Sequence, residues 1–130
     1  MAKVDFKREL KHLYQPRRAK FAIVQVPPMN FVMIDGHGDP NTSPAFQEAT
    51  NALYAMAYTL KFAVKRLWHD FVVMPVEGLW WMDDMSAFSM EAKDRWLWTL
   101  MIMQPEWVTA EMAEEARHEG ARKKDPPMLP

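Results

Sequence analysis

Hydrophobic residues recur along the chain with two different spacings, which separate the expected helices from the expected strands. Apolar residues three and four positions apart follow Ser43 and predict a long helix whose buried stripe is Phe46, Ala49, Leu53, Ala57, Leu60 and Val64. Ser43 is a favourable N-cap residue, and Pro44 suits the first helical position because no partner for its N–H is needed there. A more polar face carries Gln47, Asn51, Tyr54, Tyr58, Lys61 and Lys65.

Three other segments are rich in β-branched and aromatic residues and predict strands. Residues 21–35 alternate until two prolines interrupt them, and a strand resumes over residues 30–35. Residues 70–81 form the second segment, in which Pro75 indicates a bulge or a sheet edge. Residues 93–104 form the third.

The third predicted strand is apolar on both faces. One face carries Trp96, Trp98, Leu100 and Ile102, and the other carries Leu97, Thr99, Met101 and Met103. A strand with two apolar faces is covered on both sides. The long helix supplies one cover, and the other must be a ligand, a partner chain or a missing domain.

The remaining elements complete a single domain over residues 1–130. A helix is expected over residues 5–14, where Asp5 is a candidate cap, and a last helix runs from about Thr109 through Lys123. We therefore expect a core over residues 21–124 and a proline-rich tail over residues 125–130. Adjacent strands and segregated helices predict an α+β fold, with an antiparallel sheet and helices on one face.

Composition narrows the classes of function. With 130 residues and a formal net charge of -1, the chain lacks the strong positive charge of nucleic-acid-binding proteins, so direct nucleic-acid binding is not expected. The absence of cysteine excludes disulfides, thiolate nucleophiles and cysteine-ligated zinc. No run of residues is long and apolar enough for a membrane span or a signal peptide, which predicts a cytoplasmic protein with no membrane partner.

Motifs for metal or cofactor chemistry are also missing. The chain has no HExxH, phosphate-binding loop or GxSxG, and residues 36–38 lack the third glycine of a dinucleotide fingerprint. Asp35, His37 and Asp39 alternate, but Asp and Gly are common in turns, and a turn over residues 36–40 explains them better than a metal site does. We expect neither a metal nor a cofactor.

An aromatic cluster is the strongest candidate for a site. Twelve methionines and six tryptophans are present, and four of the tryptophans fall on the second and third predicted strands. Tryptophan faces bind flat apolar or cationic molecules, and methionine adapts to their shapes. The candidate ligand-binding residues are Trp80, Trp81, Trp96, Trp98 and Met101, and Glu77 is the candidate acid or base. Aromatic residues on strands also build ordinary core, so this alternative stays open.

Three blocks of sequence resemble the GyrI-like small-molecule-binding family. They are residues 31–49 (FVMIDGHGDPNTSPAFQEA), 73–83 (VMPVEGLWWMD) and 96–105 (WLWTLMIMQP). The resemblance implies a βαββ unit that is normally duplicated, of which this chain holds the first repeat. It also implies a small-molecule ligand and a role in xenobiotic sensing or detoxification.

Some relatives implied by the resemblance are cyclopropanoid cyclopropyl hydrolases, which open the cyclopropane ring of DNA-alkylating natural products. Water adds to an activated ring there, helped by aromatic walls and a pocket carboxylate. Within this chain, Glu77 and the tryptophans of the matching blocks are the residues to which such roles carry over. A protein-interaction module acting on a target such as gyrase is a third alternative.

A single repeat also predicts self-association, because the surface that would meet the second repeat needs a cover. We expect a symmetric homodimer that rebuilds the two-repeat arrangement. Size-exclusion chromatography with light scattering over a dilution series should give twice the 15.2 kDa chain mass. A soluble monomer at micromolar concentration would contradict the prediction.

Overall fold

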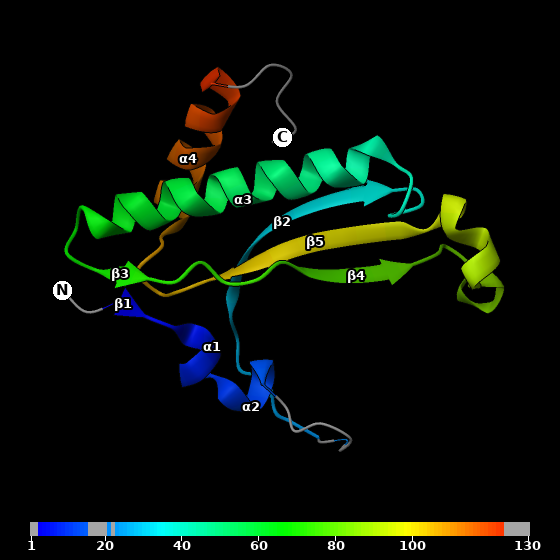
Figure 1. The fold of residues 1–130 in the computed structure, drawn as a ribbon, viewed down its shortest axis with the longest axis horizontal. Helices are drawn as coiled ribbons and strands as arrows, with labels where there is room; N and C mark the ends of the chain where they lie inside the picture. The colour runs from blue at the N-terminus through cyan, green and yellow to red at the C-terminus, as the bar shows by residue number, and fades with distance from the viewer. Residues whose placement is uncertain (1–2, 16–20, 22, 124–130) are drawn as a thin grey trace.

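An antiparallel sheet of three strands, in the order β2-β5-β4, forms the middle of the molecule (Figure 1). The structure is a computed structural model that describes residues 3–15, 21 and 23–123, so the expected tail over residues 125–130 lies outside the described residues. The strands are β2 (Asn30–His37), β4 (Glu77–Trp81) and β5 (Leu97–Gln104). The β5 strand is central and pairs antiparallel with both neighbours.

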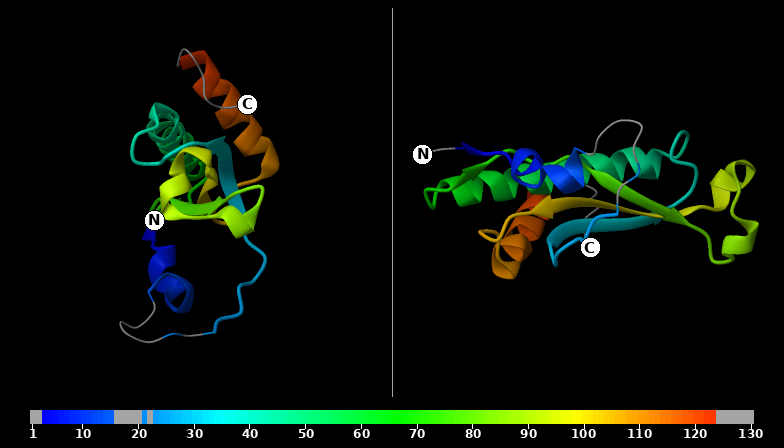
Figure 2. Two further views of the ribbon diagram at one scale, coloured as in Figure 1. Left: turned by 90° about the vertical axis from the view of Figure 1, so that its right-hand side faces the viewer. Right: turned by 90° about the horizontal axis from the view of Figure 1, so that it is seen from below.

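Helices lie on both sides of this sheet. The long helix α3 (Pro44–Lys65) packs along one face, and α4 (Ala110–Lys123) contacts α3. The short helices α1 (Phe6–Glu9) and α2 (Lys11–Tyr14) lie on the other side (Figures 1 and 2). The predicted α+β class with an antiparallel sheet is confirmed, and α3 packs on one face as expected, while α1 and α2 depart from the expectation of helices on one face. Among the described residues, no helix combines the length and apolar character needed to cross a membrane.

The main core forms where α3 meets the sheet. The predicted stripe is buried at Ala49, Leu53, Ala57, Leu60 and Val64, and it packs with the sheet residues Val32, Ile34, Trp98, Leu100 and Ile102. Phe46, at the start of the stripe, makes an edge-to-face contact with Trp98 at a centroid distance of 5.2 Å. The apolar stripe of α3 therefore packs against the alternate residues of β2 and β5 that point toward the helix.

Lys61 corrects the polar face predicted for this helix, because its side chain is buried. Its ammonium donates to the Asp70 carboxylate at 2.8 Å and to the Phe71 carbonyl oxygen at 2.6 Å. The hydrogen bond from Lys61 holds the pKa of Asp70 below its usual value. Charge pairing thus lets a lysine sit in the core and tie β3 (Asp70–Phe71) to α3.

The predicted strand over residues 70–81 is divided in two. Its start is β3, which pairs in parallel with β1 (Lys3–Val4), and its end is β4, an edge strand of the main sheet. Pro75 lies in the interruption, where a residue without an N–H cannot join a ladder. The prediction of a bulge or a sheet edge near Pro75 therefore corresponds to a break in the strand, followed by the edge strand β4.

The other two predicted strands have bounds that differ from those expected. Residues 23–29 form no strand, and Val26 is exposed, because no neighbouring segment pairs with this proline-interrupted stretch. The strand that does form, β2, continues to His37, and the turn follows at Gly38, whose φ of 118° suits glycine. Residues 93–96 precede β5, because the 3-10 helix Met90–Arg95 occupies this segment.

Two of the three predicted N-cap residues make the expected side-chain hydrogen bond. The carboxylate of Asp5 accepts from the Lys7 N–H, and Thr109 Oγ1 accepts from the Met112 N–H, so both predicted caps form. Ser43 makes no side-chain cap bond, although Pro44 does open α3. The single helix expected over residues 5–14 is divided into α1 and α2 because the backbone leaves helical geometry at Leu10.

Candidate functional site

The two faces of β5 have different environments. Residues that pair directly across antiparallel strands share a face. Trp98, Leu100 and Ile102 face α3 with their partners Gly36, Ile34 and Val32. We call the opposite side the open face, and its residues are Phe31, Met33, Asp35, His37, Glu77, Leu79, Trp81, Leu97, Thr99, Met101 and Met103. Phe31 and Met103, at one end of this face, pack with the main core cluster. The two apolar sets predicted for this strand from Leu97 onward are therefore confirmed.

Apolar side chains form much of the open face and reach solvent. Met33, Met101 and Glu77 make one row across the three strands, and Asp35, Thr99 and Leu79 make the next row. Met33 is 54% exposed and Leu79 is 58% exposed, whereas Met101 between the edge strands is buried. The face thus offers two exposed apolar side chains over a buried thioether.

At the start of β4, the side chain of Glu77 is held by a residue from the N-terminal part of the chain. The Tyr14 hydroxyl, at the end of α2, donates to Glu77 Oε2 at 2.9 Å. Burial, this hydrogen bond and the negative charge of Glu77 raise the pKa of the Tyr14 phenol, in that order of importance. Tyr14 therefore stays protonated and keeps donating, while Glu77 Oε1 has no protein donor among the described residues.

A second carboxylate lies across the sheet, on β2. Thr99 Oγ1 donates to Asp35 Oδ1 at 2.5 Å, and Asp35 is exposed. Asp35 and Glu77 lie on the two strands that flank β5, in neighbouring rows of the sheet, because Asp35 pairs with Thr99 and Glu77 pairs with Met101. Two acidic groups therefore flank the central apolar strip.

The structure divides the predicted site residues among three surroundings. Glu77, Trp81 and Met101 lie together on the open face. Trp80 pairs with Trp98, so both belong to the face turned toward α3. Trp96 lies before β5, in a separate small cluster.

Trp98 is a core residue in this arrangement. It is 1% exposed, and its ring lies over Gly36, where an added Cβ would come within 2.2 Å of the ring. Its indole Nε1 is buried without a hydrogen-bond partner among the described residues. Trp80 covers Gly78 in the same manner but is 38% exposed at the sheet edge.

Trp96 packs outside the main core. Its ring stacks on Phe88 at a centroid distance of 4.9 Å, and its Nε1 donates to the Ser89 carbonyl oxygen at 3.0 Å. Met82 and Ala92 complete this cluster beside the 3-10 helices Met85–Ala87 and Met90–Arg95. The cluster stabilises the connection between β4 and β5.

The residues considered as metal ligands serve other purposes. Asp39 Oδ1 accepts from the Asn41 N–H at 2.9 Å, as expected for an aspartate in a turn. Asp35 and His37 share the open face, but no group of three or more histidines and carboxylates in the described part of the chain is arranged to hold a metal ion.

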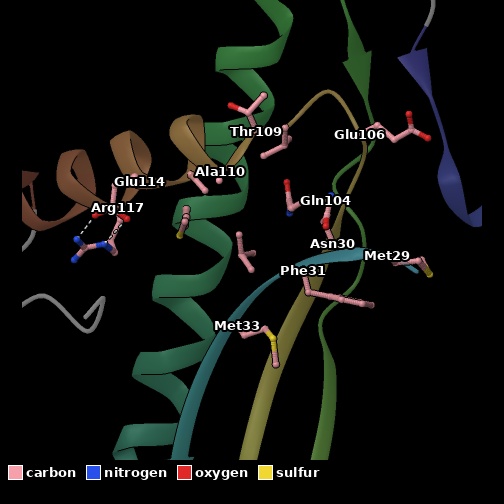
Figure 3. Close-up of a pocket in the computed structure, with 14 residues that line it drawn as sticks. Met29, Asn30, Phe31, Met33, Gln104, Glu106, Thr109, Ala110, Glu114 and Arg117 are labelled. Atoms are coloured by element: carbon pink, nitrogen blue, oxygen red, sulfur yellow. Dashed lines mark hydrogen bonds and ion pairs between the residues drawn. The ribbon is translucent and has the colours of Figure 1, made fainter. Parts of the chain in front are cut away.

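A cavity of about 660 Å³ lies beside the outer edge of β2 (Figure 3). We call it the edge cavity, and its walls come from residues 29–33, from Met56 on α3, from Gln104, and from residues 106–117 at the start of α4. Met33 also belongs to the open face, so this residue borders both regions. None of the predicted site residues lines the edge cavity.

Several residues at these two regions had no separate signal in the sequence. Tyr14 lies 63 positions from Glu77, and nothing in the local pattern links them. Asp35 was visible only as part of a turn-like run, and α4 gave no sign of a cavity. The alternation in β2 was the one usable signal, because it places Met33 and Asp35 on the same side.

Solved structures with a similar fold include three proteins from Listeria innocua. An uncharacterized conserved protein from Listeria innocua matches at 43% identity with a TM-score of 0.85 over 96% of this chain. Two hydrolases from Listeria innocua match at 41% and 42% identity, with TM-scores of 0.83 and 0.78, over 97% and 96% of this chain.

The present chain spans only part of these relatives, covering 62%, 62% and 60% of their lengths. No protein-family model and no curated protein matches the chain. The fold is therefore shared with the Listeria proteins over nearly the whole of this chain.

The contact between Tyr14 and Glu77 predicts a change in tyrosine ionisation. Replacing Glu77 with glutamine removes the negative charge, so the Tyr14 pKa should fall, although burial still holds it above about 10. A raised folded-state pKa stabilises the fold below the unfolded pKa and loses this effect as the pH rises through the folded value. Absorbance at 295 nm follows the ionisation.

The three tyrosines are distinguished by substitution. Tyr14→Phe should remove the transition at the highest pH, whereas Tyr58→Phe, at an exposed position, should leave that transition in place. An identical titration for wild type and Glu77→Gln would contradict the hydrogen bond.

Proposed function

We propose that the open face binds a flat apolar or cationic small molecule. The observation that carries this proposal is the exposure of Met33 and Leu79 beside the carboxylate of Glu77. Exposed apolar surface next to a fixed charge suits a ligand with a flat hydrocarbon body and a positive group. Met33 and Met101 adapt to ligands of different shape, which supports recognition of several compounds.

Each residue has a distinct role in the proposed site. Glu77 and Asp35 attract the positive group, and Trp81 offers an aromatic surface at the end of β4. Met101 forms the floor between the two edge strands. Trp98 supports this floor from the core side, and Trp80 and Trp96 stand outside the surface that contacts the ligand.

The resemblance of three sequence blocks to the GyrI-like family supports the same proposal. Those proteins bind small molecules on the concave side of the sheet, opposite the main helix layer. In this chain the open face is the side opposite α3. The biological role we propose is xenobiotic sensing or detoxification. A homodimer that supplies the opposite wall fits this role, since β2 and β4 are both edge strands of the sheet among the described residues.

Binding of a flat cationic dye tests the proposal. In an anisotropy titration with a phenanthridinium dye, Glu77→Gln should weaken binding roughly fivefold, because a partly exposed ion pair contributes about 1 kcal/mol. A neutral aromatic dye of similar shape should bind wild type and Glu77→Gln equally.

The matched control is Glu91→Gln, which removes an exposed charge on the 3-10 helix Met90–Arg95 without touching the open face. It should leave the affinity of both dyes unchanged. Equal losses from the Glu77 and Glu91 substitutions would show nonspecific attraction and overturn the assignment of Glu77.

A second candidate function is hydrolysis of an activated cyclopropane in DNA-alkylating natural products. Two of the similar structures are hydrolases, and Glu77 keeps one carboxylate oxygen without a protein donor while Tyr14 fixes the other. In this reaction, water bonds to a ring carbon as one carbon–carbon bond breaks. The electron pair moves into a conjugated carbonyl, and Glu77 carries a proton from the water to that oxygen.

Ring opening is tested by incubating wild type with a cyclopropane-bearing alkylating agent and measuring the hydrated product by mass spectrometry. Removing a general base should slow the reaction roughly 100-fold, so Glu77→Gln should form the hydrated product about 100 times more slowly than wild type. Glu91→Gln should retain the wild-type rate. Hydrolysis by Glu77→Gln at the wild-type rate would show that Glu77 is not the acid or base.

A further inference from the structure

We propose that the edge cavity is a second ligand site, which takes a neutral, flat, apolar molecule carrying one N–H or O–H donor. Its volume of about 660 Å³ falls in the usual range for sites that hold small organic molecules. Its walls are mainly apolar and come from β2, α3, the end of β5 and the start of α4, as Figure 3 shows. The proposal does not depend on the function assigned to the open face.

Gln104 supplies the observation that points to a ligand with a donor. Its side chain lines the cavity, and the residue is only 5% exposed. Gln104 shares the alternation of Leu100 and Ile102, so its side chain lies on the α3 side of the sheet, where the cavity lies. Its Oε1 is buried with no hydrogen-bond partner among the described residues.

The rest of the Gln104 amide cannot satisfy that oxygen. Its Nε2 donates at 3.4 Å to the Ile102 carbonyl oxygen, a long hydrogen bond. Exchanging the amide oxygen and nitrogen would place two acceptors, Oε1 and the Ile102 carbonyl oxygen, against each other. A buried acceptor without a donor is unfavourable, and a donor brought by a ligand removes that penalty.

The charges around the cavity select against anionic ligands. Glu106, Glu114 and Arg117 are the charged residues in its wall, and they leave a net negative charge. Arg117 is already engaged, because its guanidinium donates to both carboxylate oxygens of Glu114 (Figure 3). An anion would therefore meet carboxylates with no free cationic partner in the wall.

A pair of isosteric probes tests the hydrogen bond. N-phenyl-1-naphthylamine is flat and apolar with one N–H, and 1-naphthyl phenyl ether has nearly the same shape without a donor. Fluorescence enhancement measures the binding of the amine to the full chain, and displacement of the amine measures the binding of the ether. Wild type should bind the amine about tenfold more tightly than the ether.

Two substitutions assign the preference to this cavity. Gln104→Met removes the acceptor, so the two probes should bind with equal affinity, whereas Gln47→Met, an exposed glutamine on α3, should keep the tenfold preference. Ala113→Leu places a larger side chain in the α4 wall and should weaken both probes at least tenfold. Circular dichroism establishes that each variant is folded, and Ala113→Leu carries the test if Gln104→Met does not fold.

Three results would overturn the proposal. They are failure of wild type to bind the amine, equal binding of amine and ether by wild type, and unchanged binding by Ala113→Leu. Equal binding would mean that water, rather than a ligand, satisfies Gln104. Displacement of the amine by the phenanthridinium dye would place the amine on the open face instead, whereas independent binding of the two supports a separate site.

Discussion

The fold depends on one strand that is hydrogen-bonded on both sides and apolar on both faces. Because β5 pairs with β2 and β4, its backbone groups are satisfied within the sheet, and its side chains alternate between two environments. One environment is the core against α3, which contains Trp98, Leu100 and Ile102. The other is the open face, so the same eight-residue strand builds the core and the floor of the proposed site.

The edge strands β2 and β4 add two carboxylates beside the floor of the proposed site. Asp35 on β2 and Glu77 on β4 face the same side as Thr99 and Met101 because the antiparallel register places them opposite these residues. Each carboxylate accepts one hydrogen bond from a neutral hydroxyl, so neither is neutralised by a cation in the described structure. A negatively charged frame around an apolar strip is the physical basis of the binding of flat cations that we propose.

Several residues have surroundings in the structure that their local sequence pattern does not indicate, because tertiary contacts determine these surroundings. Lys61 has the helical position of a solvated lysine, yet it is buried because Asp70 approaches it. Trp80 and Trp81 are neighbours in the strand, and their alternation sends them to opposite faces. Trp96 lies within the strand predicted over residues 93–104, but the 3-10 helix that precedes it and its stacking on Phe88 place it outside the sheet.

The sequence by itself determined the α+β class, the stripe of α3 and the grouping of Leu97, Thr99 and Met101, because spacing along a helix or strand is local. It did not decide which side of β5 became the core, since both sides are apolar, and only the packing of α3 settled this. The contact between Tyr14 and Glu77 and the unpaired Gln104 Oε1 beside α4 also arose only in three dimensions. Contacts between distant segments depend on how the elements pack, and no local pattern encodes that packing.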